Sequence, residues 1–170
     1  MSFLVKNIRH NRTRIKRIYF VKRGLKPIFE NHFLNLSHME LLHKDLTDII
    51  LKTFYEVYNE LGYGFLEKVY QNSLLIELRN KGLNVIPQKK IKVYYKGNEV
   101  GEYYADLIVE DKIVLELKAV EYVVEEFENQ LLNYLRGTDC EVGLLLNFGK
   151  KPEFRRKIYE NKRKNRKNQF

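Results

Sequence analysis

Apolar residues between Asp45 and Leu61 recur every three or four positions, which places them on one face of a helix. The glycines of Gly62-Tyr63-Gly64 interrupt this pattern. A second helical pattern follows and stops at Lys81-Gly82, where a glycine suits the end of a helix. The first half of the chain therefore predicts two consecutive helices, with Tyr70 among the core residues of the second.

Beyond residue 90 the apolar period becomes two, as in a β-strand. Three strands are predicted, over residues 91–95, 99–109 and 113–119, with turns at Lys96-Gly97-Asn98 and Glu110-Asp111-Lys112. Helical spacing returns over residues 123–135, and residues 142–148 form a wholly apolar strand of the kind buried on both faces. The order α-α-β-β-β-α-β predicts an α/β fold with a mixed sheet of about four strands flanked by helices.

The net charge of +9 is concentrated at the two ends of the chain. We divide the sequence into a basic N-terminal extension (1–38), a domain (39–149) and a basic C-terminal tail (150–170) that could be helical near Phe154–Tyr159. Met39 precedes the first patterned segment, so translation could begin there. Basic tails suit salt-sensitive contacts with nucleic-acid phosphates, although they could equally serve only to keep the protein in solution.

Composition excludes several classes of protein. No apolar run approaches the roughly 18–20 residues that span a bilayer, so a membrane partner is not expected. The N-terminus lacks the apolar segment of a secretory signal. Cys140 is the only cysteine, which rules out an intrachain disulfide and a thiolate metal cluster and favours the cytoplasm. The oligomeric state is not indicated.

Charged residues interrupt two otherwise apolar strands. Asp106 lies within Ala-x-Leu-Ile-Val, and Glu116 and Lys118 lie within Val-Leu-x-Leu-x-Ala. Burying an ionised group costs several kcal/mol unless it is paired or bound to a metal. A buried ion-pair network would be costly to keep on an apolar strand, so the pattern favours a metal site.

The register of the hairpin decides whether the two acids meet. A two-residue loop would pair Asp106 with Leu115 and send the carboxylates to opposite faces, whereas a three-residue loop pairs Asp106 with Glu116. The apolar pattern favours the second, and a bulge would have the same effect. Carboxylates on opposite cross-strand positions lie about 5 Å apart and suit Mg²⁺ or Mn²⁺, with the Leu117 carbonyl as a further ligand.

These residues resemble a known family. An Asp followed by Glu-x-Lys on a hairpin is the signature of the PD-(D/E)XK nuclease superfamily, and Gly64–Tyr70 is similar to the motif that names its prokaryotic GxxExxY family. Residues 130–135 and 143–149 follow in that family's order, so the resemblance covers about residues 44–149. Ala105 replaces the proline of the superfamily name, and Phe127 stands where many relatives have histidine.

The resemblance implies a restriction-endonuclease-like fold and Mg²⁺- or Mn²⁺-dependent hydrolysis of phosphodiester bonds, with DNA favoured over RNA. The implied site consists of Glu67, Asp106, Glu116, Lys118 and Gln130. Asp106 and Glu116 would hold the metal with the Leu117 carbonyl, while Lys118 would orient the attacking water. Gln130 would help to position Lys118 or the substrate.

Two of these assignments have structural alternatives. If Gly64 is the helix N-cap, Glu67 is the third helical residue and could cap the helix rather than bind a metal or water. Gln130 and Tyr134 resemble the Gln-x-x-x-Tyr element of RecB-like nucleases but could be a half-buried pair on an amphipathic helix.

A non-catalytic module that binds nucleic acid or another partner remains the alternative function. The net charge of −7 over residues 36–149 favours it, because a nuclease cleft usually presents more basic surface. The presence of the Asp, Glu and Lys together argues against it.

Overall fold

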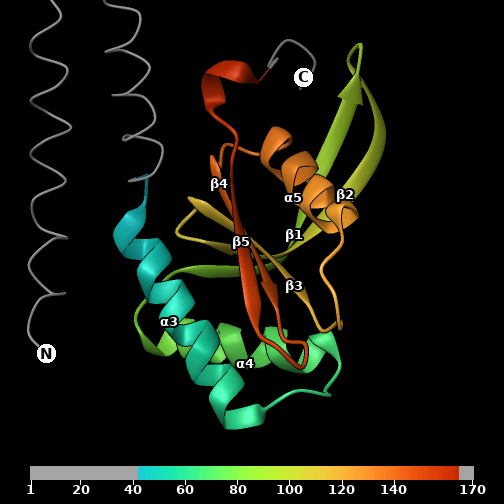
Figure 1. Ribbon diagram of the computed structural model, residues 1–170. Helices are drawn as coiled ribbons and strands as arrows, with labels where there is room; N and C mark the ends of the chain where they lie inside the picture. Colours follow the sequence, from blue (N-terminus) through green and yellow to red (C-terminus); the bar gives the residue numbers. More distant parts are fainter. Residues whose placement is uncertain (1–41, 165–170) are drawn as a thin grey trace, which may run out of the picture. The chain divides into compact units, whose positions relative to one another are not determined.

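A computed structural model describes residues 42–164 of the chain (Figure 1). The predicted N-terminal extension (1–38) and the last six residues lie outside the described part. The helices are α3 (Lys44–Leu61), α4 (Glu67–Asn80) and α5 (Glu125–Arg136), followed by a short 3₁₀ helix, η1 (Asn161–Arg163). The strands are β1 (Val85–Tyr95), β2 (Asn98–Val109), β3 (Ile113–Lys118), β4 (Val142–Asn147) and β5 (Glu153–Ile158). Over residues 42–164, no helix is both long and apolar enough to cross a bilayer.

The five strands form one mixed sheet in the order β1-β2-β3-β4-β5. Strands β3 and β4 are parallel, with α5 between them in sequence, and the other neighbouring strands are antiparallel. The predicted α/β class and the mixed sheet are confirmed.

The C-terminal segment differs from the sequence-based expectation. The predicted helix near Phe154–Tyr159 is wrong, because residues 153–158 form β5 and pair with β4. Phe154 and Ile158 are four residues apart, a spacing that fits either element, and hydrogen bonding to β4 decides in favour of a strand. The sheet therefore has five strands and continues past residue 149. Part of the positive charge of the predicted basic tail is paired within the fold, since Arg155 and Lys157 of β5 form ion pairs with Glu128 of α5.

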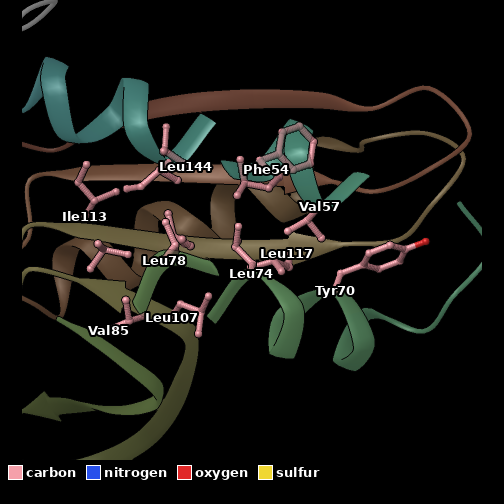
Figure 2. Close-up of a cluster of buried hydrophobic side chains, with 14 of the residues drawn as sticks. Phe54, Val57, Tyr70, Leu74, Leu78, Val85, Leu107, Ile113, Leu117 and Leu144 are labelled. Carbon is pink, nitrogen blue, oxygen red and sulfur yellow. The ribbon is translucent and has the colours of Figure 1, made fainter. Parts of the chain in front are cut away.

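Helices cover both faces of the sheet. Residues of α3 and α4 pack on one face, and Figure 2 shows their side chains directed at Leu107, Leu117 and Leu144 of the sheet. The second face packs against α5 through residues such as Val114 and Leu145. Because Leu144 and Leu145 are both buried, on opposite faces, the prediction that this strand is covered on both sides is confirmed.

Tyr70 closes the loop that joins α3 to α4. Its ring is fully buried and stacks on Phe148 with the centroids 4.3 Å apart. Its hydroxyl donates to the carbonyl of Gly62 at 2.9 Å and accepts from the backbone N–H of Phe65 at 3.2 Å. The prediction that Tyr70 is a core residue is confirmed, and its hydroxyl fixes the loop just before Glu67.

Helix α4 ends as predicted but begins later. Its C-terminus has Gly82 at φ +80°, with Gly82 N bonded to Arg79 O and Leu83 N bonded to Leu78 O, which is a Schellman motif. At the other end the N-cap is Leu66, so Glu67 is the first helical residue and not the third. Glu67 is therefore not at the position that a capping box requires.

The end of β4 holds the chain that follows Lys118. Asn147 is buried and bonds both the N–H and the carbonyl of Val120, each at 3.0 Å. Phe148 N donates to the Lys118 carbonyl at 2.7 Å. Gly149 lies so close that a Cβ atom would be 2.0 Å from the Val120 carbonyl oxygen. The glycine is thus required by close packing beside the end of β3.

We predict that Gly149→Ala destabilises the fold, because the added methyl group meets backbone that cannot move aside independently. The expected loss in free energy of unfolding is roughly 1–3 kcal/mol, as for other overpacked sites. Gly101→Ala is the control, since nothing lies within 4 Å of a Cβ atom there. Urea denaturation of both variants measures the difference, and equal midpoints would contradict the assigned contact.

Candidate metal centre

The turn between β2 and β3 sets the register of the two acids. Glu110 and Asp111 both have positive φ, and Lys112 N donates to the Val109 carbonyl at 3.0 Å. Val109 pairs with Ile113 and Leu107 with Leu115, which leaves three residues between the strands. The three-residue alternative favoured by the apolar pattern is thus the one found, and the pairing ends at Leu107–Leu115, one residue before Asp106 and Glu116.

Asp106 is held on several sides. One carboxylate oxygen accepts a hydrogen bond from Leu117 N at 2.8 Å, and the other lies 3.4 Å from Gln88 Nε2. The backbone carbonyl of Asp106 accepts from Gln71 Nε2 of α4 at 2.8 Å. Contacts from β1, β3 and α4 therefore fix both the backbone and the carboxylate of Asp106, so its carboxylate is preorganised.

The strand is distorted at this point. Ala105 and Ile108 both pack into the cluster beneath α5, although residues three apart in a regular strand face opposite sides. On the partner strand, Gln88 has φ +50° and lies between the pairs Pro87–Leu107 and Lys89–Ala105. The irregularity on both strands turns Asp106 so that its carboxylate reaches the N–H of Leu117.

Glu116 and Lys118 form a buried ion pair at the carboxyl end of β3. Glu116 is only 2% exposed, and Lys118 Nζ donates to its Oε1 at 2.6 Å. The same ammonium lies 3.9 Å from Glu67 Oε2 and 5.0 Å from the centroid of the Phe127 ring. Phe127 therefore contacts the lysine through a cation–π interaction.

Negative charge is only partly compensated at this centre. Burial raises the pKa of Glu116 to about 7, the charge of Asp106 adds to the rise, and the hydrogen bond from Lys118 opposes it. Burial also raises the pKa of Asp106, against the opposing hydrogen bond from Leu117 N. Burial raises the pKa of Glu67 as well, with Lys118 acting in the other direction. Three carboxylates thus surround the ammonium of Lys118, and Lys68 adds a further positive charge that acts on Asp106.

Lys118 keeps its proton in these surroundings. Burial alone would lower the pKa of its ammonium group, but the hydrogen bond that it donates to Glu116 and the nearby carboxylate charges outweigh this effect and raise the pKa. The centre therefore holds a positively charged hydrogen-bond donor, the Lys118 ammonium, beside an excess of carboxylate oxygens.

The donor set fits a hard divalent cation. Carboxylate and carbonyl oxygens are the ligands that Mg²⁺ and Mn²⁺ prefer, and a cation would counter the burial and, after it, the charge of Asp106 that raise the pKa of Glu116. No group of three or more His, Cys, Asp or Glu side chains in residues 42–164 is close enough to form a metal cage by itself. Asp106 and Glu116 would thus leave positions for the Leu117 carbonyl, water or a phosphate oxygen, as is usual for Mg²⁺.

Gln130 reaches the centre through Tyr134. The Gln130 amide donates to the Tyr134 hydroxyl one helical turn away. Tyr134 is 2% exposed, and its pKa is raised to about 12 by burial first and by the charge of Glu116 second. Tyr134 is therefore buried and Gln130 is half-buried, and direct positioning of Lys118 by Gln130 stays a prediction.

Sequence reasoning missed Gln71 and Gln88, which hold Asp106. Gln71 is 3% exposed on the apolar face of α4, next to Tyr70 in the motif. A glutamine among leucines on a buried helix face is a recognisable signal, because a buried amide needs a partner. Gln88 gave no comparable signal, since its role depends on the local distortion of β1.

Residues 44–157 match the family model of the PD-(D/E)XK nuclease superfamily, and the chain belongs to this superfamily. The α/β architecture with its five-stranded mixed sheet fits a restriction-endonuclease-like fold. The narrower assignment to GxxExxY proteins stays a prediction. A comparison with curated proteins gives no match. Among solved structures the chain is similar to the crystal structure of SSO0001, with 18% identity and a TM-score of 0.47; the similarity covers 55% of this chain and half of that one.

We predict that the metal-free protein loses stability as the pH rises from about 4.5 to about 7. The folded-state pKa of Glu116 is raised above its ordinary value of 4.5, so the folded state binds this proton more tightly than the unfolded state does. The stabilisation that this proton gives to the folded state is lost as the pH rises through about 7. Glu116→Gln should flatten this decline and be more stable than wild type at pH 8, by on the order of 2 kcal/mol.

Urea denaturation in EDTA over this pH range measures the effect. Glu60→Gln, which removes an exposed carboxylate on α3, is the control and should follow wild type. A Glu116→Gln protein with the same pH slope as wild type would contradict the assigned electrostatics.

Proposed function

We propose that this protein is a Mg²⁺-dependent nuclease that hydrolyses phosphodiester bonds, with Mn²⁺ as an alternative ion and DNA as the favoured substrate. The observation that carries the proposal is the meeting of Asp106, Glu116 and Lys118 at the buried end of β3, in a chain of the PD-(D/E)XK superfamily. Ordinary core packing gives no reason to place two carboxylates and an ammonium together at this depth.

Asp106 and Glu116 would hold the ion together with the Leu117 carbonyl, and Glu67 would be a further carboxylate facing the same space. Once bound, the ion would polarise the phosphate and lower the pKa of a bound water. The hydrogen bonds from Leu117 N and Gln71 keep Asp106 in place before any substrate arrives. This preorganisation means that little reorientation is needed during the reaction.

Lys118 would orient the attacking water or offset negative charge that develops on the phosphate. Its raised pKa supports a protonated amine in this role. Its ammonium is bonded to Glu116, which limits the directions in which it can point. Gln130 and Tyr134 would support the same carboxylate from α5.

We predict that Glu116→Gln and Lys118→Ala each reduce Mg²⁺-dependent cleavage of DNA at least about 10²-fold, because the first weakens the proposed metal site and the second removes the cation that acts on the water or the phosphate. Single-stranded, duplex and branched DNA are tested in parallel, with RNA as a further arm. The Glu60→Gln variant is the matched control and should cleave as wild type does.

Thermal melts with and without Mg²⁺ accompany these assays. Wild type should gain stability from the ion and Glu116→Gln should not, because the bound ion stabilises only the folded state that holds it. Wild-type protein that binds DNA without cutting it, and gains nothing from Mg²⁺, would overturn the nuclease proposal in favour of the non-catalytic alternative.

A separate prediction concerns Glu67. As the first residue of α4 it contributes about 0.3–1 kcal/mol through the helix dipole, which is the most that Glu67→Gln should cost in stability. If its charge also serves the ion or the attacking water, turnover should fall about 10²-fold with little change in melting temperature. We expect this second result, because the carboxylate faces Lys118 and not the helix N-terminus alone. Near-normal turnover would remove Glu67 from the site.

A further inference from the structure

A groove with basic and aromatic walls lies at the C-terminal end of α5. Its volume is about 360 Å³, and part of its lining comes from Lys92, Tyr103, Arg136, Tyr159, Arg163 and Lys164. Over residues 42–164, no Asp or Glu contributes to the lining. The groove therefore contrasts with the metal centre, where carboxylates outnumber ammonium groups.

Three separate parts of the fold build this groove. The β1–β2 hairpin supplies one wall, the end of α5 supplies another, and the segment after β5 supplies the third. Figure 1 shows the backbone of these three elements. Lys164 anchors that last segment, since its ammonium donates to the carbonyls of Thr138 and Cys140 at 2.7 and 2.8 Å. The Arg136 guanidinium lies 5.4 Å from the centroid of the Tyr159 ring. The walls are thus joined to one another by specific contacts.

The groove is connected to the metal centre through two tyrosines. Tyr103 lines the groove and is 41% exposed, while its ring packs on Tyr134 with centroids 5.8 Å apart. Tyr134 in turn is close enough to Glu116 for the carboxylate charge to raise its pKa. Tyr134 is buried, so Tyr103 is the accessible ring of this pair on the groove side.

We propose that the groove binds unpaired nucleotides of the substrate strand. This inference rests on the proposed nuclease function and narrows its substrate to nucleic acid with a single-stranded segment. Bases would stack on Tyr103 and Tyr159, and Arg136 and Arg163 would contact phosphates. Basic grooves that carry aromatic side chains bind single strands in this way, because each unpaired base offers a free face.

Size and chemistry both favour an unpaired strand. A hollow of about 360 Å³ has room for one or two nucleotides and not for a duplex. In a duplex the faces of each base are covered by its neighbours, so tyrosine rings on a groove wall could not stack on them. Arg163 is mostly exposed beside its partner Glu160, and exchange of that ion pair for a phosphate contact costs little.

The test measures binding of the full chain in EDTA, where cleavage does not occur. Fluorescence anisotropy compares a labelled 12-nucleotide thymidine strand with a blunt 12-base-pair duplex. The variants are Arg163→Gln, Arg136→Gln combined with Arg163→Gln, and Tyr103→Leu, which keeps an apolar contact for Tyr134. Lys52→Gln on the exposed side of α3 is the matched control, and thermal melts verify that each variant is folded.

Wild type should bind the single strand at least about 10-fold more tightly than the duplex. The double arginine variant should lose about 10-fold in affinity, and its slope of log K against log salt should fall by about 1.4, or about 0.7 for each lost contact. Arg163→Gln alone should give about half of that change in slope. Tyr103→Leu should lose about 10-fold with an unchanged slope, because stacking carries no charge. The Lys52→Gln control should change neither quantity.

Equal binding of strand and duplex, or groove variants that bind as wild type does, would overturn the proposal. The two proposals fail separately. Cleavage that depends on Glu116 but is indifferent to the groove variants would reject the groove and leave the nuclease assignment. Groove-dependent binding without Mg²⁺-dependent cleavage would reject the nuclease assignment and leave the groove.

Discussion

Asp106 and Glu116 place two like charges at the edge of the core, with the ammonium of Lys118 as the nearest compensation. Burial and mutual repulsion both work against their ionised forms, which is why the pKa of Glu116 is raised to about 7. Such an arrangement persists only if the surrounding structure fixes the groups where they are. Much of the fold around β3 can be understood as meeting this requirement, and a bound cation would complete the compensation.

The segments that flank the site contribute through backbone contacts as much as through side-chain chemistry. Tyr70 ties down the loop that delivers Glu67, and Gln71 beside it bonds the Asp106 carbonyl. At the other end of the site, Asn147 and Gly149 hold the chain just beyond Lys118. A centre of uncompensated charge needs neighbours that cannot relax, and close packing and buried hydrogen bonds supply that rigidity.

The sequence predicted those features that local periodicity and chemistry determine. Alternation located β2 and β3, and the charges at Asp106 and Glu116 stood out because burial makes them costly. Features that depend on tertiary contacts could not be predicted from the sequence. Residues 153–158 have a pattern that fits a helix or a strand, and only β4 makes them a strand. The later start of α4 depends on Tyr70 holding the preceding loop, and the contact of Gln88 with Asp106 depends on a distortion that no composition signal marks.

The separation of charge also constrains how a polyanion could approach this molecule. A metal-free centre with three carboxylates repels phosphates, and neutralising it requires a cation. Attraction at longer range must then come from another surface, such as the groove that Arg136 and Arg163 help to line. Because exposed charges are screened by salt and buried ones much less so, binding should respond to ionic strength while the chemistry of the carboxylates should not. An acidic reaction centre and a separate basic binding surface can therefore coexist in one nuclease. The net negative charge of residues 36–149 is then compatible with an active site.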